Sequence, residues 1–196
     1  MKQTANGNEV LDFDPRKLPA GHLGAIGFMS AAASSTDSII EMAIAGMLGV
    51  DGEQGYAVTA HMSAPLRVSV LKASAEIALT SAAALDELDV VLSRIDTAAK
   101  ERNRFVHGSW CFRSSDGAVL LVQQEARTHV EIRSRPVAVE EIRSKAAALY
   151  EAGMDLMRFM MAVDKLPALP RHDRVRGVNT PKARKAARKQ KDNGSR

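Results

Sequence analysis

The sequence lacks several features that mark common protein classes. It has no run of eighteen apolar residues, which excludes a membrane-spanning helix within the sequence. We therefore expect no association with a membrane. No cluster of positive charge precedes an apolar stretch near the N-terminus, so we expect no secretory signal. The single cysteine, Cys111, has no partner for an internal disulfide. This fits a reducing cytoplasm, where we expect the protein to reside.

Metal-ligand spacings are also missing. The five histidines include no His-x3-His pair, and a lone cysteine makes no Cys-x2-Cys motif. His107 and Cys111 are separated by three residues and form the only pair with a metal-ligand spacing. Gly108, however, interrupts the helix that would align their side chains. We therefore expect no metal and no other cofactor. We interpret Cys111 as a buried strand residue rather than a nucleophile.

Charge is distributed unevenly along the sequence. Residues 171–196 hold ten Lys and Arg against two Asp, whereas the first 170 residues hold 17 basic and 21 acidic residues. A mildly acidic body with a strongly basic tail indicates a polyanion partner, contacted through its phosphates without sequence preference. The tail cations predicted to bind nucleic acid are Lys182, Arg184, Lys185, Arg188, Lys189 and Lys191. The alternative is a terminus that only improves solubility.

The sequence divides into three parts, with enough length for about one domain. Residues 1–22 are polar, contain two prolines and show no period, so we predict an irregular lead-in with a short extended piece at 10–13. Residues 23–165 contain the periodic segments. Residues 166–196 form the basic tail, which has too few apolar residues to fold alone.

Hydrophobic periodicity predicts four helices in the body. The predicted helices are 25–48, one that starts at Ser63-Ala64-Pro65, one that follows Thr80-Ser81 and ends at His107-Gly108, and 139–162. Glycines and acids indicate a loop at 49–55. Gly21, Gly24 and Gly27 match no nucleotide-binding loop, and we interpret them as helix-packing glycines.

Between the last two helices the hydrophobic period changes from helical to alternating. Residues 110–113 and 118–123, joined by a Ser-Ser-Asp-Gly turn, indicate a β-hairpin, and 129–133 adds a third strand. The predicted fold class is therefore mainly α: a four-helix bundle with a small β-hairpin or three-stranded insertion at 109–135, before the last helix. Such bundles host many activities, so the fold alone assigns no function.

The end of the third predicted helix carries the functional argument. Arg102 falls on its apolar stripe, where the steps of three and four predict another apolar residue. A charge there must be paired, or must face a cleft or a partner. Asn103 and His107 lie above each other on one face. These are the groups of a phosphate site. The alternative is a helix C-cap, which explains His107 and Gly108 fully and Arg102 less well.

Arg102-Asn103-x3-His107 resembles the R-[polar]-x3-H motif of the HEPN superfamily, helical-bundle proteins that include many metal-independent ribonucleases. The following Val-His-Gly-x-Trp and hairpin are also similar to HEPN-like bacterial proteins, and the resemblance covers about residues 25–165. It implies an endoribonuclease in which Arg102 holds the scissile phosphate and His107 is the general acid or base beside the RNA 2′-hydroxyl. Asn103 would orient one of them, and Arg104 would add a nucleic-acid contact.

The same resemblance implies partners. Arg102 and His107 lie about 140° apart around an ideal helix, and HEPN ribonucleases meet this by pairing two motifs across a homodimer. RNA, a second copy and an antitoxin or other regulatory protein are thus the expected partners. Two alternatives stay open: a non-catalytic HEPN-like module that binds nucleic acid or a protein, and a small-molecule enzyme with its ligand in the bundle groove.

Overall fold

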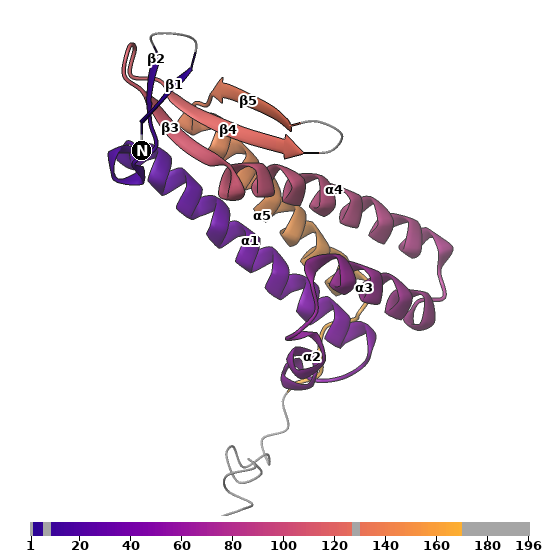
Figure 1. Cartoon of the computed structure of the whole chain (residues 1–196). Coiled ribbons are helices and arrows are strands. Elements are labelled where there is room, and N and C mark those ends of the chain that lie inside the picture. Colours follow the sequence, from indigo (N-terminus) through magenta and orange to yellow (C-terminus); the bar gives the residue numbers. More distant parts are fainter. Residues whose placement is uncertain (1, 6–8, 127–129, 170–196) are drawn as a thin grey trace, which may run out of the picture.

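The computed structural model describes residues 2–5, 9–126 and 130–169. Within these ranges the chain is mainly helical, as predicted, and a small antiparallel sheet covers one end of the helices (Figure 1). The long helices are α1 (Ala20–Met47), α4 (Ala82–His107) and α5 (Val139–Ala162). The shorter helices α2 (Gly52–Thr59) and α3 (Ala64–Ala78) both pack against α1. None of the described helices combines the length and the apolar character needed to cross a membrane.

Several helix ends follow from capping residues in the sequence. α3 begins after Ser63 and carries Pro65 in its first turn. α4 begins after Ser81, whose hydroxyl accepts a hydrogen bond from the Ala84 amide (3.3 Å). α5 has the predicted bounds, 139–162. Both predicted helix starts and the last helix are therefore confirmed.

The predicted loop at 49–55 is wrong over its second half. Asp51 begins α2 with a capping box: its carboxylate accepts from the Gln54 backbone amide (2.9 Å), and the Gln54 side chain accepts from the Asp51 amide (3.3 Å). Gly55 is not a loop residue. A Cβ at this position would lie 2.4 Å from the Ala45 Cβ of α1, so close helix packing requires the glycine.

The glycines near the start of α1 do not all pack against another helix. A Cβ on Gly21 would touch the Val139 side chain of α5 at 3.4 Å, in ordinary contact. Gly24 and Gly27 instead face open space. Their interpretation as helix-packing glycines is therefore wrong for the single chain, in which both positions are exposed.

The sheet has five strands within the described residues, in the order β1-β2-β3-β4-β5. The bounds are β1 Lys2–Ala5, β2 Glu9–Asp12, β3 Ser109–Arg113, β4 Val119–Ala126 and β5 Val130–Pro136. The last three strands form the predicted insertion at 109–135. The first two correct the prediction of an irregular lead-in at 1–22, as does the start of α1 at Ala20. The extended piece predicted at 10–13 is confirmed as β2, shifted by one residue.

The lead-in is ordered by a distant partner. Strand β2 pairs with β3 through Leu11 opposite Arg113 and Asp12 opposite Phe112. A four-residue strand shows little alternation, and its partner lies about a hundred residues further along the sequence, so tertiary pairing decides its structure.

One apolar cluster lies beneath the sheet and fixes the end of α4. Phe105 of α4, Leu121 of β4 and Ile142 of α5 are fully buried together there. Phe105 thus takes the buried position near the helix end, while the adjacent Val106 is partly exposed. Because the sheet packs on this cluster, β4 lies beside the last turn of α4.

Candidate functional site

Arg102 occupies the buried face of α4 without becoming part of the core. It lies two turns beyond buried Ile95 and one turn before buried Phe105, and it is half-buried. Its Nη1 donates a hydrogen bond to Oδ1 of Asn103 (2.8 Å). No carboxylate of the described residues forms an ion pair with Arg102. The guanidinium therefore keeps N–H donors for an acceptor from outside.

The neighbouring cations are paired. Arg104 donates to Glu101 at 2.6 Å, and Lys100 pairs with Asp96 at 2.6 Å. Across the α4 end, Arg135 of β5 binds the Glu141 carboxylate through both terminal nitrogens (2.6 and 2.9 Å). These two hydrogen bonds lower the pKa of Glu141 and raise that of Arg135.

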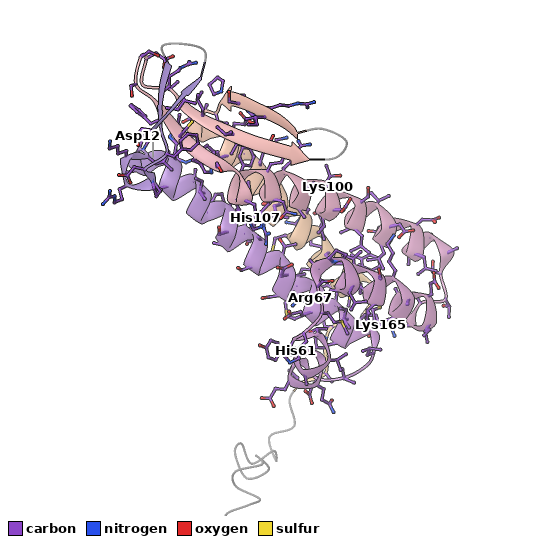
Figure 2. All side chains as sticks on the ribbon, in the orientation of Figure 1. Asp12, His61, Arg67, Lys100, His107 and Lys165 are labelled. Atoms are coloured by element: carbon purple, nitrogen blue, oxygen red, sulfur yellow. The ribbon has the colours of Figure 1, made fainter. Side chains whose placement is uncertain are left out.

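The last turn of α4 borders a hollow of about 350 Å³. The residues that line it are Asn103, Arg104, His107, Gly108 and Ser109, with Val122 and Gln123 of β4. His107 is exposed at the end of the helix, below the strands in Figure 2. The hollow thus offers an imidazole, two amides, a hydroxyl and a guanidinium, and none of the described residues that line it carries a carboxylate.

Gly108 sets the geometry of this junction. Its φ of −73° and ψ of 153° suit any residue. A Cβ, however, would lie 2.6 Å from the Arg104 carbonyl oxygen and 2.4 Å from Leu121 Cδ1. Space, not backbone conformation, requires glycine where α4 passes directly into β3.

Trp110 anchors the same junction. Its indole Nε1 donates to the Phe105 carbonyl oxygen (2.9 Å), which is left without a helical partner near the end of α4. Its ring stacks on Phe105 with centroids 6.3 Å apart. The indole therefore fixes the helix end that carries His107.

The structure brings together some of the predicted site residues and separates others. Asn103 connects them: it bonds Arg102 and lines the hollow with His107 one turn later. Arg102 is not among the residues that line this hollow. The two predicted catalytic groups therefore do not meet at one hollow within a single chain.

Other predicted residues have clear positions. Arg104 lines the hollow but is paired with Glu101. Cys111 is buried in β3, as predicted. The tail cations Lys182, Arg184, Lys185, Arg188, Lys189 and Lys191 lie outside the described residues.

Sequence reasoning did not find the strand side of the hollow, Ser109 and Gln123. A signal was present in the predicted hairpin. Pairing about the turn at 114–117 places Ser109 opposite Val122, so Gln123 comes next, opposite the helix end. It is also the first polar residue after the apolar run of β4.

A second, larger hollow of about 490 Å³ lies between α1, α3 and α4. Its floor is apolar, and its rim carries the ion pairs Lys72–Asp89 (2.7 Å) and Lys100–Asp96. Asn103 lines both hollows. The surface beside the motif is therefore continuous along α4.

Neither a metal-ligand cluster in the described residues nor a similar protein points to a function. In the described part of the chain, no group of three or more His, Cys, Asp or Glu side chains could hold a metal ion. Comparison with protein-family models, curated proteins and solved structures found no match to this chain. A functional assignment therefore depends on the motif and on the geometry around it.

Proposed function

We propose that the protein is a HEPN-like, metal-independent endoribonuclease whose site is built on Arg102, Asn103 and His107. One observation carries the proposal: a half-buried guanidinium that no described carboxylate pairs, held by Asn103 at the edge of the hollow that His107 lines. A phosphate group fits the fork of such a guanidinium and supplies the missing negative charge. The four helices of a HEPN-like bundle would correspond to α1, α3, α4 and α5.

The proposed reaction uses the RNA's own nucleophile. The 2′-hydroxyl gives its proton to His107, the 2′-oxygen bonds to phosphorus, and the bond from phosphorus to the 5′-oxygen breaks. A proton then passes to the departing 5′-oxygen from this imidazolium or from that of a second copy. The products are a 2′,3′-cyclic phosphate and a 5′-hydroxyl. Arg102 stabilises the charge that builds on the phosphoryl oxygens.

A homodimer completes this proposal. Arg102 and His107 lie on different sides of α4. A second copy of the chain is therefore needed to bring the guanidinium of one motif to the imidazole of the other. RNA is the proposed substrate, and the cations of the tail would hold its phosphates.

The runner-up is a non-catalytic HEPN-like module that binds nucleic acid or a protein partner. The separation of Arg102 from His107 favours this function, because Arg102 does not line the hollow that His107 lines. An unpaired guanidinium binds a phosphate equally well when no cleavage follows. Salt-dependent RNA binding without cleavage would select this function.

The test is RNA cleavage in EDTA by the parent protein and by Arg102→Met and His107→Ala. Loss of the general acid–base should lower the rate by about 10²–10⁴-fold, with cyclic phosphate ends in the parent reaction. His61→Ala and Arg143→Ala are matched controls, because both side chains are exposed away from α4, His61 in the turn after α2 and Arg143 on α5. Circular dichroism and the oligomeric state should be unchanged. Cleavage at the parent rate by Arg102→Met would refute the assignment.

A further inference from the structure

We propose that the hollow between α1, α3 and α4 binds a small organic cation, a primary amine on an apolar body, and that Asp37 is its counter-ion. The apolar floor of the hollow, an imbalance of charge around it and the surroundings of the Asp37 carboxylate carry this inference. It does not rest on the proposed ribonuclease function, because neither Arg102 nor His107 lines this hollow.

The hollow has the size and the floor of a small-ligand site. Its volume of about 490 Å³ lies within the range of pockets that hold small molecules. Ile40 of α1 and Leu92 and Ile95 of α4 belong to the buried core, and Val68 of α3 packs against the same cluster. Lys100 marks the α4 rim in Figure 2. The apolar part of a ligand can therefore be buried between three helices.

The charged side chains around the hollow do not balance. Three carboxylates line it, those of Asp37, Asp89 and Asp96, against the two ammonium groups of Lys72 and Lys100. Lys72 pairs with Asp89 at 2.7 Å, and Lys100 pairs with Asp96 at 2.6 Å. Among the described residues that line the hollow, Asp37 therefore leaves one net negative charge.

Asp37 has no counter-ion within the described part of the chain. It is half-buried, and no hydrogen bond or ion pair joins its carboxylate to another described residue. Arg67 of α3 reaches α1 one turn further along, where it pairs with Glu41 at 3.1 Å. Asp37 also lies in the C-terminal half of α1, far from the first turn, where a helix stabilises a carboxylate. A cation in the hollow would offset the cost of burying this charge alone.

The lining residues favour a cation that carries N–H donors. A carboxylate accepts such donors in charge-assisted hydrogen bonds, which are shorter and stronger than neutral ones. Quaternary ammonium groups lack these donors and are recognised by aromatic cages, whereas none of the described residues that line the hollow is aromatic. An anion would add to the net negative charge. A primary amine on an apolar body therefore matches both the floor and Asp37.

An amide NMR titration of the full chain with matched probes tests the site. The probes are phenylbutylamine and hexylamine, with phenylbutanol and phenylbutyrate as the uncharged and anionic counterparts of the first. We expect the amines to bind with a Kd on the order of millimolar. Phenylbutanol should bind about tenfold more weakly, because it lacks the charge, and phenylbutyrate should not bind. The amide shifts should centre on Ile40, Val68 and Ile95.

Three substitutions separate the role of the carboxylate from that of the floor. Asp37→Asn keeps the size of the side chain and removes its charge, so amine binding should weaken about tenfold while phenylbutanol binding stays unchanged. Ala99→Leu enlarges a side chain that lines the hollow, so both the amine and the alcohol should bind more weakly. Asp86→Asn is the matched control, because it removes an exposed carboxylate of α4 that does not line the hollow. Circular dichroism should be the same for all variants.

The outcomes are independent of RNA cleavage. Equal affinities of the parent for phenylbutylamine and phenylbutanol would overturn the inference, as would amine binding at the parent affinity by Asp37→Asn. The absence of amide shifts around the hollow with both amines would overturn it too. Selective amine binding that depends on Asp37 and on Ala99 would support the site even if the protein does not cleave RNA.

Discussion

The substitution Gly108→Ala tests how the end of α4 is built. The added Cβ would lie 2.4 Å from Leu121 Cδ1 and 2.6 Å from the Arg104 carbonyl oxygen, whereas carbon atoms pack best at about 3.5–4.0 Å. The Leu121 side chain is fully enclosed, so it has little room to yield. The carbonyl belongs to the helix backbone and accepts the Gly108 amide at 3.1 Å. The helix end must therefore move away from β4.

Overpacking of this kind costs about 1–3 kcal/mol. For a domain of this size that corresponds to a fall in Tm of roughly 2–4 °C per kcal/mol. The assay is thermal or urea unfolding followed by circular dichroism. Gly24→Ala is the matched control, because its Cβ would meet open space in the second turn of α1. The control should stabilise the protein by about 1 kcal/mol through helix propensity.

Opposite signs for the two glycine substitutions are the critical result. A Gly108→Ala protein as stable as the parent would show that the contact between β4 and the α4 end is loose, which would refute the argument. If the protein cleaves RNA, the same variant should also lose activity, because the hollow between His107 and Gln123 is formed by this junction.

Two further predictions concern other parts of the fold. Asp164 follows α5 with a left-handed φ of 52°, so Asp164→Gly should raise the free energy of unfolding by about 1 kcal/mol in urea denaturation; an unchanged or lower value would contradict this. The Lys17 ammonium donates to Asp12 at 2.5 Å and lowers the pKa of that carboxyl below 3.8. The pair therefore stabilises the fold above pH 3.8 and loses its effect as pH falls through the lower folded pKa. Lys17→Met should raise the pKa of Asp12 in an NMR titration, and an unmoved value would refute the assignment.

Local sequence signals determine much of the helical framework. The bounds of α5 and the starts of α3 and α4 could be predicted because periodicity and capping residues act within a few positions. Helix α2 was predictable too. Asp51 and Gln54 have capping-box spacing, but the glycines on either side indicated a loop more strongly.

Long-range pairing sets the limit of such prediction. β2 acquires its structure from β3, and no periodicity in residues 9–12 reveals that partner. The half-buried position of Arg102 was predictable from the stripe on α4. To predict that Gln123 lines the hollow, the register of the β3–β4 hairpin is needed. The segment of Gln123 alone indicates only a strand that ends in polar residues.

The position of Arg102 also links stability to function. A half-buried guanidinium without a described counterion costs free energy that an apolar residue would not. Met at this position would continue the stripe from Ile95 to Phe105, so Arg102→Met should unfold at a higher urea concentration than the parent. The same variant should lose RNA cleavage. If it is instead markedly less stable, Arg102 is a structural residue, and the main support for the phosphate site is removed.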